Sequence, residues 1–300
     1  MKNLLLTTLL CLSYALAFCS IPNQEKEALF ALYNATEGNN WTTDWNLDDP
    51  VSTWNGVTVK NDHVVGIDLS YNNLKGELPY QLSDLKFLES LNLFRNEISG
   101  TLPNTIGELK NLKHLNLAFN KLVGTLPNVL GELTKLESLI LFMNNFEGEL
   151  PKAISGMVRL EQLELYNNNL VGQIPSEIGS LVNLKVLLLS SNSFSGKIPD
   201  TIKDLGSLER LGLFDNKLFG GIPTLLGELT ELTELTLSDN LFYGTVPNEL
   251  RKLENLEVLM LNNNDLEGDF VALGQAFPKL YQYEYKNLKD AENTAVANTD

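Results

Sequence analysis

The chain has 300 residues, of which 38 are acidic and 22 basic, and its formal net charge is −16. This charge repels nucleic acid, and no basic cluster with interleaved aromatic residues interrupts it. Only two histidines occur, and no metal-ligand spacing, phosphate-binding loop, dinucleotide fingerprint or nucleophile elbow is present. Composition and motifs therefore favour neither an enzyme nor a nucleic-acid-binding protein, and we expect no metal and no cofactor.

Residues 1–17 have the pattern of a signal peptide. Lys2 supplies the charged end, Leu4–Leu16 the apolar stretch, and Ala15-Leu16-Ala17 an A-x-A cleavage site. Both cysteines lie within or beside this segment, so no internal disulfide is expected. No later stretch is long and apolar enough to span a membrane. We therefore expect a secreted, extracellular protein, monomeric and without a transmembrane segment in its mature chain.

Residues 18–63 are expected to form an N-terminal cap. Glu25–Tyr33 has helical apolar spacing, with one face made of Ala28, Leu29 and Leu32. The cap contains all three tryptophans of the chain, Trp41, Trp45 and Trp54. Aromatic packing that seals one end of a core explains them better than a ligand site does.

Two N-glycosylation sequons also fall in this cap. They are Asn34-Ala35-Thr36 and Asn40-Trp41-Thr42. In a eukaryotic host they predict glycans on Asn34 and Asn40. Chance occurrence in a polar loop explains them equally well, so both interpretations stay open.

A 24-residue repeat occupies residues 64–264 in nine units. It reads L-x-x-L-x-L-x-x-N-x-L-x-G-x-[LI]-P, and its asparagine returns without insertion or deletion. The nine copies are Asn72, Asn96, Asn120, Asn144, Asn168, Asn192, Asn216, Asn240 and Asn264. Fixed self-similarity at this period is typical of a solenoid, in which each unit buries its apolar side chains only against its neighbours.

Each part of the repeat predicts a local structure. The L-x-x-L-x-L segment alternates with period two, which predicts a short strand whose leucines point into a core. The asparagine can satisfy backbone groups where the chain leaves the strand, and the glycine suits a tight or positive-φ position. The proline fixes φ and blocks the strand, so a return segment with a short 3₁₀ or α turn should follow.

The repeat pattern weakens toward the C-terminus. Residues 265–288 are expected to form a C-terminal cap, in which Tyr283 and Tyr285 occupy leucine positions. Residues 289–300 are polar and are expected to be a disordered tail.

The repeat resembles that of extracellular leucine-rich-repeat proteins of the plant-type subclass, whose signature is the G-x-[LI]-P turn. Polygalacturonase-inhibitor proteins and receptor-kinase ectodomains share it, and the resemblance covers roughly residues 24–288. It implies an α/β solenoid, a right-handed superhelix with a parallel β-sheet on its concave face and a helical N-cap. The stretch "STWNGVTV" is similar to the family's cap motif but has Ser52 and Val59 in place of cysteines, so aromatic packing is expected to hold the cap.

In such a fold the outward-facing strand positions of all repeats form one concave surface. Apolar side chains gather there on adjacent repeats, and clustered exposed apolar groups usually mark a binding surface. Aromatic residues and arginine also dominate interface energetics. The expected partner-binding residues are Phe94, Arg95, His114, Phe119, Ile140, Phe142, Met143, Tyr166, Arg210 and Phe214.

The charges on this surface differ along the chain. Arg95 and Arg210 are expected to pair with acidic groups of a partner. Basic groups of a partner would suit the carboxylates nearer the C-terminal half, namely Asp215, Glu234 and Asp239. The alternative for the aromatic residues is that they stack on one another across strands and only stabilise the sheet.

The resemblance implies a secreted recognition module that binds a protein partner through the concave face, as an inhibitor or as a defence or signalling component. Two alternatives remain open: a ligand-binding co-receptor or adhesion module, and an extracellular protein that binds polysaccharide or ice. Of the nine positions that follow the repeat glycine, only three are threonine and four are charged, which argues against a flat ice-binding ladder. The net charge argues against binding to acidic pectin.

Overall fold

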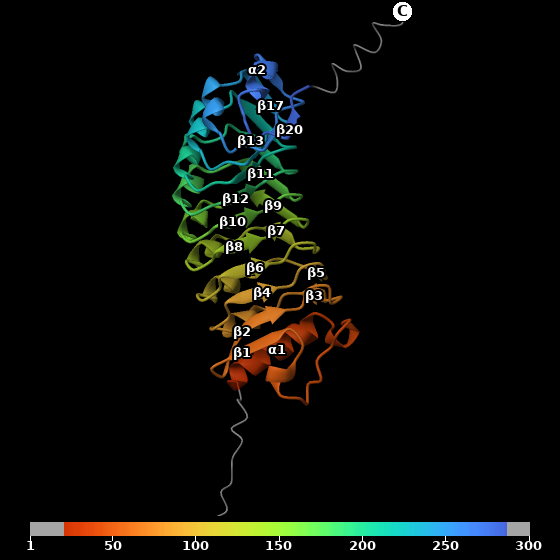
Figure 1. The fold of residues 1–300 in the computed structure, drawn as a ribbon. Helices are drawn as coiled ribbons and strands as arrows, with labels where there is room; N and C mark the ends of the chain where they lie inside the picture. Colours follow the sequence, from red (N-terminus) through yellow and green to blue (C-terminus); the bar gives the residue numbers. More distant parts are fainter. Residues whose placement is uncertain (1–20, 287–300) are drawn as a thin grey trace, which may run out of the picture.

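A computed structural model describes residues 21–286, which stack rung upon rung into an elongated solenoid (Figure 1). Helix α1 (Asn23–Ala35) lies at one end of the column and helix α2 (Phe270–Gly274) at the other. The predicted signal peptide at 1–17 and the predicted tail at 289–300 lie outside the described residues. Within residues 21–286, no helix combines the length and the apolarity needed to cross a membrane.

One face of the column is an eleven-stranded sheet, and its strands follow one another in chain order. The first pair, β1 with β2, is antiparallel, and every later pair is parallel. The strands are β1 (Val57–Lys60), β2 (His63–Asp68), β4 (Ser90–Asn92), β6 (His114–Asn116), β8 (Ser138–Ile140), β10 (Gln162–Glu164), β12 (Val186–Leu188), β14 (Arg210–Gly212), β16 (Glu234–Thr236), β18 (Val258–Met260) and β20 (Gln282–Glu284).

The register of this sheet follows the 24-residue repeat. Leu91 pairs with Leu115, Leu115 with Leu139, and so on along the stack, and these leucines are at most 1% exposed. The side chains between them point to the opposite, outward face, because successive strand residues alternate. The leucine-rich-repeat solenoid and its parallel sheet are confirmed.

A second layer of short strands follows the repeat asparagine and lies beside this sheet (Figure 1). Seven of them form one sheet, and two more pair separately. They are β3 (Lys75–Glu77) with β5 (Glu97–Ser99), and β7 (Val123–Thr125), β9 (Asn145–Glu149), β11 (Asn169–Gln173), β13 (Ser193–Gly196), β15 (Lys217–Gly220), β17 (Leu241–Thr245) and β19 (Asp265–Glu267). The repeat glycine lies in this layer with positive φ, for example +78° at Gly148, where a side chain would be strained.

The return segments are 3₁₀ helices that begin directly after the repeat proline. They are η3 (Tyr80–Asp84), η4 (Asn104–Glu108), η5 (Asn128–Glu132), η6 (Lys152–Gly156), η7 (Ser176–Ser180), η8 (Asp200–Asp204), η9 (Thr224–Glu228) and η10 (Asn248–Lys252). Of the two expected forms, 3₁₀ or α, the 3₁₀ turn is the one present, and its apolar residues complete the core wall.

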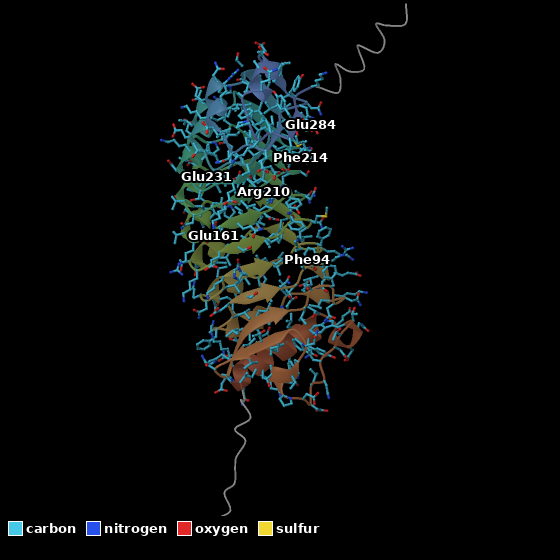
Figure 2. All side chains as sticks on the ribbon, in the orientation of Figure 1. Phe94, Glu161, Arg210, Phe214, Glu231 and Glu284 are labelled. Carbon is cyan, nitrogen blue, oxygen red and sulfur yellow. The ribbon has the colours of Figure 1, made fainter. Side chains whose placement is uncertain are left out.

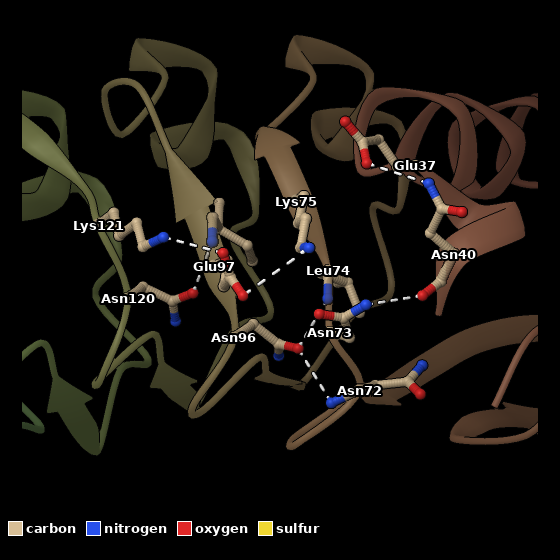
Figure 3. A network of polar contacts seen from close by, with 11 residues as sticks. Glu37, Asn40, Asn72, Asn73, Leu74, Lys75, Asn96, Glu97, Asn120 and Lys121 are labelled. Atoms are coloured by element: carbon tan, nitrogen blue, oxygen red, sulfur yellow. Dashed lines mark hydrogen bonds and ion pairs between the residues drawn. The ribbon is translucent and has the colours of Figure 1, made fainter. Parts of the chain in front are cut away.

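The repeat asparagine joins each turn to the turn before it (Figure 3). The Oδ1 of Asn96 accepts the backbone N–H groups of Asn72 and Leu74, both at 3.0 Å. Its Nδ2 donates to the carbonyls of Leu69, at 2.8 Å, and Leu93, at 3.0 Å. Equivalent bonds recur around Asn120, Asn144, Asn168, Asn192, Asn216, Asn240 and Asn264. The predicted role of the asparagine is confirmed.

Aromatic rings close the N-terminal end of the core. Trp45 lies 4.9 Å from Trp41 and 4.7 Å from Trp54 between ring centroids, and Tyr33 packs on the same group. All three tryptophans are at most 6% exposed, and each indole N–H donates to a backbone carbonyl. Glu25 of α1 is 3% exposed and accepts the N–H of Val64, so the helix is bound to the first parallel strand.

Lysine and glutamate side chains pair between successive repeats on the outer edge of the strands. Lys113 Nζ lies 2.8 Å from Glu89, and Lys185 Nζ lies 2.7 Å from Glu161. Each pair joins the residues that directly precede two neighbouring strands of the sheet. All four side chains are well exposed, so each pair contributes little to stability.

Replacing Asn144 with alanine should lower the free energy of unfolding by about 3 kcal/mol, because buried backbone groups of two repeats lose their partners. Urea unfolding followed by circular dichroism measures the change. Asn145→Ala is the matched control, since this neighbouring side chain is exposed. Equal stability of the two variants would contradict the role assigned to the buried asparagine.

Candidate functional site

Five aromatic side chains on five successive repeats contact one another along the concave face. The ring centroids of Tyr71 and Phe94 are 5.2 Å apart, those of Phe94 and Phe119 are 5.4 Å apart, and those of Phe119 and Phe142 are 5.4 Å apart. Phe142 and Tyr166 are stacked at 4.3 Å. We call this group, Tyr71, Phe94, Phe119, Phe142 and Tyr166, the aromatic ladder.

The ladder is a continuous apolar surface, but its rings partly cover one another. Phe94 and Phe142 lean together to a centroid distance of 6.4 Å across the repeat between them, whose small Ala118 is fully buried beneath. Edge-to-face contacts of this kind stabilise the sheet. The stacking expected as an alternative is therefore present, and it coexists with an apolar surface that faces solvent at Tyr71, which is 60% exposed.

The residue just before each repeat asparagine adopts the left-handed conformation. Its φ lies between 51° and 55° in all nine repeats, because the chain must turn sharply out of the strand there. The nine residues are Tyr71, Arg95, Phe119, Met143, Asn167, Ser191, Asp215, Asp239 and Asn263. Among residues with a side chain, asparagine and aspartate tolerate this conformation best, and bulky residues are true outliers.

The choice of residue at this left-handed position changes along the solenoid. Repeats five, seven, eight and nine use asparagine or aspartate, and repeat six uses serine. The first four repeats instead use the bulky Tyr71, Arg95, Phe119 and Met143. These are the repeats that carry most of the aromatic ladder. Local conformational preference is therefore overridden where the ladder lies, which is typical of a functional surface.

The remaining predicted residues fall into different surroundings. Figure 2 labels Phe94 of the ladder and, nearer the C-terminal end of the solenoid, Arg210 and Phe214. The guanidinium of Arg95 lies over the rings of Tyr71, at 5.5 Å, and Phe119, at 5.7 Å, so it belongs to the ladder surface. Ile140 and His114 occupy outward positions of β8 and β6, and His114 Nε2 is 3.9 Å from Glu137. Met143 is 40% exposed beside the ladder.

Arg210 and Phe214 are not part of the ladder but line a hollow in the C-terminal half of the concave face. We call it the acidic hollow; its volume is about 510 Å³. It is lined by Glu164, Tyr166, Asn167, Leu188, Ser190, Ser191, Arg210, Gly212, Phe214, Glu234, Thr236 and Met260. Because Tyr166 is also the last ring of the ladder, the two features are continuous.

The charges of the hollow are partly paired within it. Arg210 Nε donates to Glu234 at 2.6 Å, and this hydrogen bond raises the pKa of Arg210. Glu164 is 9% exposed and accepts a hydrogen bond from Gln162 Nε2 at 2.6 Å. Burial, and then the charge of Glu164, raise the pKa of the Tyr166 hydroxyl. The expectation that Arg210 serves acidic groups of a partner is weakened, because Glu234 already holds it.

Sequence reasoning left three of these residues out of the predicted site. Tyr71 begins the ladder, Glu164 forms a buried wall of the hollow, and Gly212 lies at the hollow's centre in the strand register. The 24-residue alignment does place Arg210 directly beside Glu234 in neighbouring strands. Reading that column across repeats would have found the ion pair.

The two predicted glycosylation residues lie at the surface of the cap. Asn34 and Asn40 are exposed, whereas Thr36 of the first sequon is buried. Asn40 Nδ2 donates to Glu37 at 3.2 Å, as Figure 3 shows. Modification of these residues stays a prediction. Among residues 21–286, no group of three or more histidine, cysteine, aspartate or glutamate side chains has the arrangement of a metal site.

Comparisons with known proteins agree with this architecture. A model of a leucine-rich repeat region matches residues 144–281, and a leucine-rich-repeat model matches residues 87–109 and 111–133. A probable leucine-rich repeat receptor-like protein kinase of Arabidopsis thaliana is 38% identical over a region covering 22% of this chain and 8% of the kinase. The chain is a leucine-rich-repeat protein.

Solved structures extend the likeness to most of the solenoid. A plant peptide hormone receptor, RGFR1 in complex with RGF2, is 35% identical with a TM-score of 0.70, over 74% of this chain and 35% of the receptor. The ectodomain of the Arabidopsis thaliana receptor kinase GASSHO1/SCHENGEN3, in complex with CASPARIAN STRIP INTEGRITY FACTOR 2, is 30% identical with a TM-score of 0.75, over 88% and 35%. A plant ice-binding protein is 26% identical with a TM-score of 0.67, over 83% and 88%.

The chain thus spans about a third of the length of these two receptor chains, and far less of the kinase. The shared part is the ectodomain solenoid, a fold of binding modules.

Replacing Met143 with asparagine should raise the free energy of unfolding by about 1 kcal/mol, because asparagine tolerates the left-handed conformation that methionine resists. The reverse change in the next repeat, Asn167→Met, should lower it by a similar amount. Urea unfolding of both variants, with Met143→Ala as a control for loss of the side chain, checks the pair. Two changes of the same sign would show that conformational strain does not distinguish these repeats.

Proposed function

We propose that this protein recognises a protein or peptide partner through the aromatic ladder on its concave face. The observation that carries the proposal is the placement of bulky residues at left-handed positions only in the first four repeats. Selection for stability alone would not favour Phe119 or Met143 at these positions. Asparagine or aspartate, as in Asn167 and Asp215, adopts the same conformation with less strain.

The composition of the surface supports this role. Aromatic rings, Arg95 and the exposed Met143 are the residue types that supply most of the energy of protein interfaces. The similar receptor ectodomains were solved in complex with RGF2 and with CASPARIAN STRIP INTEGRITY FACTOR 2, which makes a ligand-binding role the natural comparison. We infer an extracellular recognition module without catalysis, acting as an inhibitor, a defence component or a ligand-binding part of a signalling system.

Ice binding is the weaker candidate, although a plant ice-binding protein shares the fold. The positions after the repeat glycine form a row that lies in or just after the strands of the second layer. Only Thr101, Thr125 and Thr245 among them are threonine, and charged residues interrupt the row. The regularity that a crystal surface would match is missing from that row.

The proposal is tested by capture from extracellular fluid of the source organism. The bait is the mature chain, compared with a variant in which Phe94, Phe119, Phe142 and Tyr166 are all serine. The variant should lose a protein that the wild type retains, because the apolar surface is removed.

A second variant controls for the number of apolar side chains removed. It carries serine at four exposed residues of the second layer, Val123, Val171, Phe219 and Tyr243. It should retain the partner, and circular dichroism should show all three proteins folded. Retention by the ladder variant together with loss from the control would move the site to the second layer and refute the proposal.

A further inference from the structure

One outward column of the sheet lines the acidic hollow and contains a glycine between larger residues. Glu164, Leu188, Gly212, Thr236 and Met260 are consecutive partners in the register of β10, β12, β14, β16 and β18. Gly212 contributes no side chain, and its φ is not in the left-handed region, so backbone geometry does not require glycine here. A Cβ at this position would lie 2.9 Å from Leu188 Cδ2 and 3.1 Å from Ser190 Oγ, so neighbouring side chains pack over the glycine and line the hollow together with it.

The charge inside the hollow is negative. Two carboxylates, Glu164 and Glu234, face one guanidinium, that of Arg210. Glu164 is nine-tenths buried, yet its only hydrogen bond among the described residues comes from the neutral Gln162. Arg210 also attracts Glu164 through its charge, but it gives its hydrogen bond to Glu234. Glu164 therefore still gains from a further cation that reaches it, because the local dielectric is low. The exposed Asp215 beside Phe214 and the net charge of −16 add to the same field.

Apolar side chains form another part of the wall of the hollow. Leu188 and Met260 line it together with the rings of Tyr166 and Phe214. A lysine or arginine side chain suits such a hollow, because its apolar stem can contact the apolar wall while its charged tip reaches the carboxylates. An aromatic ring also attracts a cation placed over its face.

We propose that the acidic hollow receives a lysine or arginine side chain of the partner whose apolar residues lie on the aromatic ladder. This inference rests on the proposed function and specifies the partner's chemistry. The tip of the basic side chain lies between Glu164 and Glu234, and its stem lies against Leu188 and Met260. Arg210 disfavours binding of this basic side chain, because its guanidinium is already paired with Glu234 and repels a second cation.

The geometry also sets the spacing of the partner's residues. From the repeat of Phe142 to that of Gly212 there are three strand steps, which is about 14 Å. An extended peptide advances about 3.3 Å per residue, so the basic residue lies about four positions from the apolar residue that contacts Phe142. Tyr166, which belongs to both features, lies between them.

The test selects peptides from a phage-displayed random library, about twelve residues long, on the wild-type protein. The selected sequences should carry lysine or arginine about four positions from an aromatic or large aliphatic residue. The affinity of the best peptide is then measured against Glu164→Gln/Glu234→Gln, Arg210→Gln and the ladder variant with four serines. Circular dichroism and urea unfolding confirm that each variant is folded.

The three variants give different expected results. The double glutamine variant should bind the peptide at least about tenfold more weakly, because the carboxylates lose their charge at constant shape. Arg210→Gln should bind it more tightly, a result that a purely structural role of Arg210 would not produce. Replacing the peptide's basic residue with glutamine should abolish both differences.

Two outcomes would overturn the inference in distinguishable ways. Peptides that require the ladder but bind the double glutamine variant as well as the wild type would refute the basic occupant and leave the proposed function standing. A wild type that retains no peptide, or peptides indifferent to the ladder, would count against both.

Discussion

The buried asparagine of each repeat is the interaction on which the rest of the structure depends. It supplies one acceptor and two donor hydrogens to backbone groups that lose their strand partners at the turn, and it takes those groups from two adjacent repeats at once. Because the bonds reach one repeat back, each turn is fixed in position against the turn before it. The register of the concave sheet and the alignment of its outward columns follow.

The same turn imposes a conformational cost on the residue before the asparagine. Every repeat places that residue in the left-handed region, and the choice of side chain then reveals what each repeat is selected for. The later repeats mostly choose asparagine or aspartate, which relieve the strain. The early repeats choose residues that add apolar surface or, in Arg95, a cation that covers two rings. The concave face is thereby divided into an aromatic half and a polar, acidic half, with Tyr166 at the boundary.

Much of this architecture is predictable from the sequence because it depends on periodicity. The spacing of asparagine, glycine and proline gives the strands, the turns and the 3₁₀ return segments, and the inward leucines give the core. The burial of the three tryptophans of the cap is equally predictable, since large rings in a polar segment favour a buried position. These features depend on each residue's position in its own repeat.

The candidate site is less predictable because it depends on contacts between repeats. The tilt of Phe94 and Phe142 over Ala118 follows from side-chain packing across three strands, and no single repeat encodes it. The left-handed φ of Phe119 and Met143 cannot be predicted from the repeat pattern, because the pattern allows any residue at that position. The hollow at Gly212 depends on five residues spread over 96 positions, from Glu164 to Met260. The pairing of Arg210 with Glu234 could have been found, since both occupy one column.

Site-specific photo-crosslinking tests the central claim most directly. A photoreactive phenylalanine analogue would replace Phe119 on the ladder in one protein and Phe219 on the second layer in another, and both would be irradiated in extracellular fluid of the source organism. The account predicts that a distinct partner becomes attached through position 119 and that position 219 yields none. Attachment through position 219 alone would contradict it and place recognition on the second layer of the solenoid.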